Sequence, residues 1–123
     1  MAAAYASLAA TVLLHQDWIE IRSVSNQHKV SNLFKITKLD LGECAAITLA
    51  QELQADRLLL DDLAARKEAQ RRGLPVIGTV GIVLIAKQFG LIPNVKQVLD
   101  DLITKGTRIS QQLYKQTLTA AKE

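Results

Sequence analysis

Hydrophobic and polar positions along the second half of the chain predict short strands that alternate with helices. Residues 57–62 (RLLLDD) form an apolar run that ends in two acids, which is typical of a strand covered on both faces in a parallel sheet. Residues 63–72 then have the spacing of an amphipathic helix, which a glycine and a proline end. A second short strand is predicted at 76–77, and an apolar helix follows it to about Phe89.

Three further helices are predicted from their end signals and periodicity. The helix from Asp40 to about Gln54 begins with the D-x-x-E form of a capping box and continues with apolar residues at helical spacing. Another helix is expected over 93–105, where a Pro-Asn pair begins it and a glycine ends it. Ser110 is the predicted cap of a last helix towards Ala121.

The first 38 residues have weaker patterns. Residues 2–14 are rich in helix formers and predict a helix. Residues 18–24 (WIEIRSV) alternate large apolar and polar side chains, as a half-buried strand does. Residues 25–38 are polar and weakly periodic, so we predict a loop with room for one helical turn.

The repeated order of strand and helix, with short connections, predicts an α/β fold. Right-handed parallel crossovers of this kind give a three-layer sandwich, in which helices flank a small parallel sheet. The length of 123 residues indicates one domain over 1–123, and 49% hydrophobic residues are enough for a core. The net charge of +3 suits a phosphate-bearing partner without requiring one.

Cysteine and hydropathy patterns bear on the compartment. Cys44 is the single cysteine, so no intrachain disulfide forms and a reducing cytoplasm is the expected location. No Lys or Arg precedes the apolar N-terminal run, which argues against a secretory signal. The most apolar segment, 74–86, is shorter than the roughly 20 residues that a membrane span needs, so no membrane partner is expected.

Three acidic residues are the candidate chemistry. Asp61 and Asp62 follow a predicted strand, and ligands collect beyond the carboxyl ends of parallel strands. Glu43 lies in the first turn of the preceding helix, so the three carboxylates suggest a divalent-cation site. Helix capping explains each of them without a metal. A helix that leads directly into a parallel strand is expected to begin at the opposite end of the sheet from that strand's finish. This geometry would separate Glu43 from Asp62 unless the helix crosses the sheet obliquely.

Several segments in the right order resemble the carboxyl part of PIN-like domains. They are L-D-x-G-E from Leu39, L-L-L-D-D-x-x-A-R-K from Leu58, G-L-P-V-x-G-T-x-G from Gly73 and G-x-R-I-S from Gly106. The resemblance covers about 39–123 and is strongest to an uncharacterised prokaryotic group that is related to toxin ribonucleases.

The resemblance implies an α/β domain whose acidic cluster binds Mg²⁺ or Mn²⁺ and hydrolyses phosphodiester bonds, most often in RNA. Such an ion neutralises charge on a phosphate and activates a water molecule. On the family pattern Glu43 matches the second acid and Asp62 the third, as catalytic metal ligands, with Asp61 as an auxiliary ligand. The toxin ribonucleases work in toxin–antitoxin pairs, so an antitoxin or a second copy of the chain is an implied partner.

Two differences from the family pattern bear on activity. No apolar strand that ends in Asp precedes Trp18, so the first acid is not assigned and the chain is predicted to be the carboxyl portion of such a domain. Residues 63–65 are Leu-Ala-Ala where some members have a fourth acid. If the encoding DNA holds an in-frame upstream segment with an apolar strand that ends in Asp, the nuclease function is favoured. Without such a segment, we expect this chain neither to bind Mn²⁺ more tightly than millimolar nor to cleave RNA. The alternative is a non-catalytic protein-interaction module that binds a partner through its apolar helices, or an inactive remnant of such a domain.

Basic residues after the two acids are a candidate RNA track. Phosphate contacts supply most of non-specific affinity for nucleic acid. The candidates are Arg66, Lys67, Arg71 and Arg72. A solvated helix face with Glu68 interleaved explains the same residues. Residues 97–118 also have the pattern of two helices joined by a short turn, which is typical of a DNA-binding helix-turn-helix. A helical hairpin that packs on the sheet or on a second chain explains the same pattern. The hairpin is favoured because the second helix carries only one cation in its body.

Overall fold

The computed structural model describes residues 16–123, which form six helices and a two-stranded parallel sheet. The elements are α2 (Gln27–Thr37), α3 (Leu41–Leu53), β1 (Leu58–Leu59), α4 (Leu63–Arg71), β2 (Val76–Ile77), α5 (Thr79–Gln88), α6 (Val95–Thr104) and α7 (Gln111–Ala120). The predicted α/β class is confirmed. The helix predicted for 2–14 lies outside the described residues.

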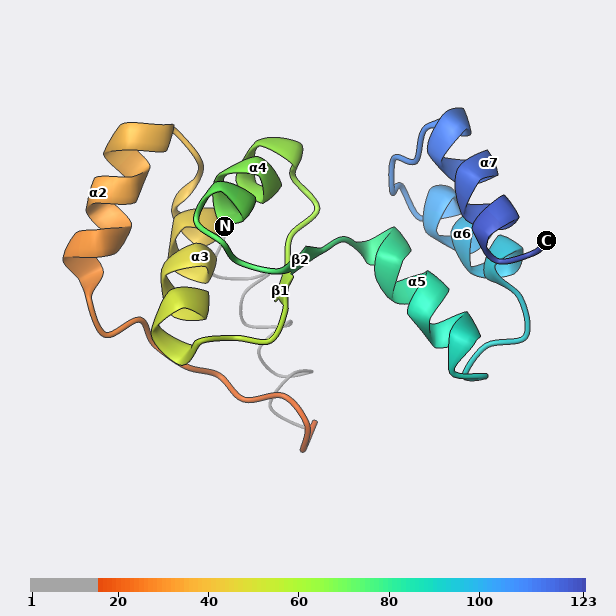
Figure 1. The fold of residues 1–123 in the computed structure, drawn as a ribbon, viewed down its shortest axis with the longest axis horizontal. Coiled ribbons are helices and arrows are strands. Elements are labelled where there is room, and N and C mark those ends of the chain that lie inside the picture. The colour runs from red at the N-terminus through yellow and green to blue at the C-terminus, as the bar shows by residue number, and fades with distance from the viewer. Residues whose placement is uncertain (1–15) are drawn as a thin grey trace.

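The two strands lie in the middle of the molecule, with helices on either side. Leu58 pairs with Val76 and Leu59 with Ile77, and α4 forms the crossover between the strands. Figure 1 shows α2, α3 and α4 gathered on one side of the strands and α5, α6 and α7 on the other. This arrangement is the predicted sandwich, with a sheet of minimal width.

The helix ends follow the predicted local signals. The Asp40 carboxylate accepts a hydrogen bond from the Glu43 N–H at 2.7 Å, and the Glu43 carboxylate accepts one from the Asp40 N–H at 3.2 Å, which completes a capping box. Helix α3 ends at a left-handed Gln54. Asn94 and Ser110 cap α6 and α7. Because these signals need only neighbouring residues, they were readable from the sequence.

The strand predicted for 18–24 is absent from the structure, in which only β1 and β2 pair among residues 16–123. Trp18 is 81% exposed and Ile21 is also exposed, whereas Val24, at the end of the segment, packs partly buried against the core. The prediction was wrong because alternation identifies two faces of a segment but supplies no partner strand for its backbone groups.

The loop predicted for 25–38 was also wrong, because most of this segment is helix α2. The Asn26 side chain caps the helix, and Val30 and Leu33 are buried in the same cluster as α3. The carboxylate of Glu52 on α3 accepts a hydrogen bond from the Asn26 N–H at 2.9 Å. Contacts with α3 therefore stabilise a helix whose own polar sequence gave little signal.

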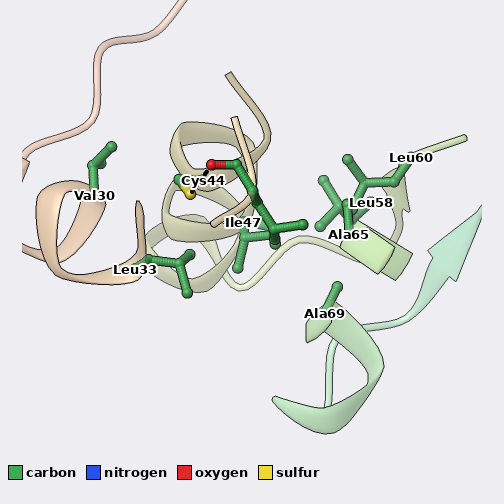
Figure 2. Close-up of a cluster of buried hydrophobic side chains, with 10 residues drawn as sticks. Val30, Leu33, Cys44, Ile47, Leu58, Leu60, Ala65 and Ala69 are labelled. Carbon is green, nitrogen blue, oxygen red and sulfur yellow. Dashed lines mark hydrogen bonds between the residues drawn. The ribbon is translucent and has the colours of Figure 1, made fainter. Parts of the chain in front are cut away.

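The buried side chains form two clusters, one on each side of the strands. In the first cluster, Ile47 of α3 lies between Leu33 of α2 and the side chains of Leu58 and Ala65 (Figure 2). The second cluster joins α5, α6 and α7, and its buried members are Val83, Val95, Leu99 and Ala121. This packing supports the helical-hairpin reading of 97–118.

The strand β1 is covered on one face only. Leu58 and the following Leu60 are buried, whereas Leu59 is 53% exposed. The prediction that both faces of this run are buried was therefore wrong, because no further element of the described chain packs over Leu59 closely enough to exclude water.

Helix α3 and strand β1 run in opposite directions, as Figure 1 shows. The beginning of α3 and the carboxyl end of β1 therefore lie at the same end of the domain. The direction of α3 relative to β1 therefore does not require Glu43 and Asp62 to lie at opposite ends of the sheet, and the proximity of their side chains stays a prediction.

Candidate functional site at the carboxyl end of the strands

The carboxyl ends of the two strands are joined through Asp61. Its carboxylate accepts hydrogen bonds from the Thr79 N–H at 2.8 Å and from the Thr79 hydroxyl at 2.6 Å. Gly78 is the N-cap residue of α5 and has no side chain to cap that helix. Asp61 thus provides, from the end of β1, the acceptor that the first turn of α5 needs.

The same contacts keep Asp61 ionised. The hydroxyl of Thr79, then its N–H, and finally the charge of Arg66 lower the pKa of the Asp61 carboxyl, against a smaller opposing effect of burial. Asp61 therefore presents a fixed negative charge beside the N-terminus of α5, and both of its oxygens are already hydrogen bonded to Thr79.

Asp62 is the N-cap residue of α4. One of its carboxylate oxygens, Oδ2, accepts a hydrogen bond from the Ala65 N–H at 2.9 Å. The other oxygen has no hydrogen-bond partner among residues 16–123. The interpretation of Asp62 as a helix cap is thus confirmed, and one oxygen of its carboxylate makes no capping hydrogen bond.

Glu43 is half-buried in the first turn of α3, where its Oε2 atom completes the capping box with Asp40. Its Oε1 atom makes no hydrogen bond within the part of the chain that the structure describes. Like Asp62, Glu43 has a structural role and one remaining carboxylate oxygen.

The donor set does not amount to a complete metal site. Residues 16–123 contain no group of three His, Cys, Asp or Glu side chains close enough to hold a metal ion together. Asp61 and Asp62 follow β1 directly, and Glu43 lies in the first turn of α3, the helix that leads into β1. The ligand roles of these three residues remain predictions.

A groove of about 630 Å³ begins at Asp61 and runs between α4, α5 and α7. Its polar lining comes from two sides: Asp61, Arg66 and Thr79 on one, and Thr107, Arg108 and Gln116 on the other. The sequence reading did not identify this groove. Its only signals were two family motifs, G-T-x-G and G-x-R-I-S, whose Thr79 and Arg108 line it.

The predicted basic track is divided between different faces of α4. Glu68 pairs with Arg71 and with Arg72, whose Nε lies 2.7 Å from the Glu68 carboxylate. Lys67 is exposed to solvent and does not line the groove, whereas Arg66 does. Of the four basic residues, Arg66 alone faces the acidic end of β1.

One other feature has a simple structural role. The Cys44 thiol is fully buried, and this burial raises its pKa. A buried thiol of this kind acts as a small apolar side chain.

Among the helices of the described residues, none is both long enough and apolar enough to cross a bilayer.

Fold and site define a small α/β domain with acidic residues where its parallel strands end. A family model for the PIN domain matches residues 3–123, and the chain belongs to the PIN domain family. PIN domains are generally nucleases and typically use divalent metal ions. The match confirms the resemblance read from the sequence motifs and begins well before the residues that carry it. No curated protein and no solved structure matches the chain.

Proposed function

We propose that this protein is a Mg²⁺- or Mn²⁺-dependent ribonuclease of the toxin–antitoxin type that works in the cytoplasm. The observation that carries the proposal is membership of the PIN domain family over residues 3–123. The position of Asp61 and Asp62, directly beyond the end of β1, supports it, since parallel α/β sheets bind ligands at that edge.

The residue roles in this proposal follow the family pattern. Glu43 and Asp62 are the catalytic metal ligands, and Asp61 is the auxiliary ligand. In support, Glu43 and Asp62 each keep one carboxylate oxygen outside their capping hydrogen bonds. No catalytic step is assigned to an ion, because the described residues do not bring three such ligands together.

Incubation of the purified chain with single-stranded RNA, with Mn²⁺ or with a chelator, tests the proposal. Asp62→Asn removes the negative charge, but asparagine caps a helix as well as aspartate does, so the fold is preserved. Asp56→Asn is the matched control, since Asp56 is exposed and lies before β1. We expect cleavage that needs Mn²⁺, is lost in Asp62→Asn and persists in Asp56→Asn. Intact RNA with the wild-type chain would refute the proposed activity.

The second candidate function is a non-catalytic interaction module, and one surface favours it. Large apolar side chains are exposed beside β1 and along α5, with Phe89 and Leu91 each 75% exposed and Leu59 and Ile82 about half exposed. Leu59, Ile82 and Phe89 line the same surface hollow, and an exposed apolar surface of this kind often marks a protein interface. The proposed partner is an antitoxin or a second copy of the chain.

Light scattering after size-exclusion chromatography tests the second candidate on the isolated chain. If a second copy covers this surface, Phe89→Ser shifts the protein from dimer to monomer, whereas Ile21→Ser, at another exposed position, does not. A wild-type monomer at all concentrations would exclude self-association.

A further inference from the structure

We propose that the groove between α4 and α7 binds the backbone of single-stranded RNA, with Arg66 and Arg108 contacting phosphates from its two sides. The choice of RNA as ligand rests on the proposed function. The two arginines, their positions and the character of the groove are observations of this structure.

The first side of the groove brings a cation to the end of β1. A Cβ atom at Gly78 would lie 3.2 Å from Asp61 Oδ1 and 3.3 Å from Arg66 Nη1. The missing side chain therefore lets both groups approach the same backbone position. Arg66 forms no ion pair within residues 16–123, and the Asp61 carboxylate is hydrogen bonded to Thr79. The Arg66 guanidinium is thus available to an anionic ligand.

The second side of the groove is fixed by contacts between α6 and α7. The Tyr114 hydroxyl donates a hydrogen bond to the Asp100 carboxylate at 2.6 Å, and Lys96 pairs with the same carboxylate at 2.8 Å. Arg108 lies in the connection that these contacts hold, is exposed, and forms no ion pair in the described chain. A second guanidinium therefore faces the groove from a segment 42 positions after Arg66 (108 minus 66).

The floor of the groove is apolar and aliphatic. Its members come from β2, α5, the connection before α7 and α7 itself, and they include Ile77, Val80, Leu84, Ile109 and Leu113. A volume of about 630 Å³ is within the range of sites for small organic ligands. An unpaired base fits against such a floor without specific recognition of its type. No described lining residue is aromatic, so the base does not stack on a side chain there.

Charge and shape together select the ligand. A phosphodiester strand offers anionic groups to the two guanidinium groups and an apolar face to the floor between them. The bases of a duplex are paired and stacked inside it. A duplex therefore contacts the two arginines through its phosphates but cannot place a base against the apolar floor. We therefore expect single-stranded RNA to bind more tightly than a duplex of the same length.

Fluorescence anisotropy with a labelled single-stranded RNA in EDTA measures binding without cleavage. Arg66→Ala and Arg108→Ala are each expected to weaken binding about tenfold at low salt. Each also lowers the slope of log K against log salt by about 0.7, the value for one lost phosphate contact on a single strand. Lys67→Ala and Lys115→Ala are matched controls on α4 and α7, because both lysines are exposed and lie outside the groove lining.

The outcomes separate this inference from the proposed function. Binding that depends on Arg66 and Arg108 supports the groove even if the chain never cleaves RNA. Binding that depends on Lys67 instead, or that neither arginine variant changes, would place the RNA elsewhere and overturn the groove, even if the chain is an active nuclease. Equal affinity for single strand and duplex would overturn the role of the apolar floor. Circular dichroism of each variant confirms that it is folded.

Discussion

Asp61 accepts two hydrogen bonds from Thr79, a residue 18 positions later in the chain, through its N–H at 2.8 Å and its hydroxyl at 2.6 Å. This pair connects the carboxyl end of β1 to the first turn of α5. It also lies at one side of the groove, because Asp61, Arg66, Gly78 and Thr79 all line it. This contact therefore bears both on folding stability and on the geometry of the groove.

Thr79→Val is expected to destabilise the protein by about 1 kcal/mol, since it removes one hydrogen bond to a charged acceptor that is partly exposed. Thr79→Ser is the matched control, because it keeps the hydroxyl. Urea unfolding followed by circular dichroism measures both variants. Equal midpoints for the valine and serine variants would show that the hydroxyl contributes nothing.

The Asp61 contact also predicts a pH dependence. The hydrogen bonds from Thr79 hold the pKa of the Asp61 carboxyl below its ordinary value of 3.8, so the stabilisation is present above that pH and is lost as pH falls through the lowered pKa. The difference in stability between Thr79→Val and wild type should therefore shrink in acid. A difference that stays constant from neutral pH to the acid transition would contradict this linkage.

Glu123 gives a second acid-sensitive contact, in the cluster of α5, α6 and α7. Its carboxylate pairs with Lys87 at 2.8 Å and accepts hydrogen bonds from the N–H groups of Val95 and Lys96 at 2.6 Å and 3.1 Å. These contacts, led by Lys87, lower the Glu123 pKa from 4.5 to about 2. The contact stabilises the folded state fully above pH 4.5, and this stabilisation is lost as pH falls towards 2.

Glu123→Gln is expected to lower the Tm by a few degrees at neutral pH and by less at pH 2, where the wild-type side chain is becoming protonated. Thermal melts of both proteins across this range measure the effect. A Tm difference that is the same at neutral pH and at pH 2 would show that the charge of Glu123 is not the source of the stabilisation.

Gly81 is required for α5 to pack against β2. A Cβ atom at this position would lie 2.8 Å from Cγ1 of Ile77, an atom of a stiff β-branched side chain. Gly81→Ala is therefore expected to destabilise the protein by about 1–3 kcal/mol, even though alanine is the better helix former. In an Ile77→Ala background, the same substitution should stabilise by up to about 1 kcal/mol. A double-mutant cycle in urea measures this coupling, and additive effects would contradict the close contact.

The sequence predicted those parts of the fold that depend on neighbouring residues. The capping box of Asp40 and Glu43, the cap at Asp62 and the turn to α5 after Gly78 all formed as expected. Their common property is that donor and acceptor, or turn and helix, lie within a few positions of one another.

The predictions that were wrong concern elements whose packing or pairing partners are distant in sequence. Residues 18–24 have the alternation of a strand, but no strand of the described chain accepts them. Helix α2 needs Glu52 and the apolar face of α3, neither of which its own composition reveals. The two contacts that shape the groove, Thr79 on Asp61 and Tyr114 on Asp100, join separate elements and left no local signal.

The central claim is that Glu43 and Asp62 act together at the carboxyl end of β1. Broadening of amide NMR signals during Mn²⁺ titration tests it most directly, since the effect reports proximity to the ion even when binding is weak. We expect selective broadening at Glu43, Asp61, Asp62 and Thr79, which disappears in Asp62→Asn. Broadening that begins at other carboxylates, such as Asp100 and Asp101, or that is uniform along the chain, would contradict the claim.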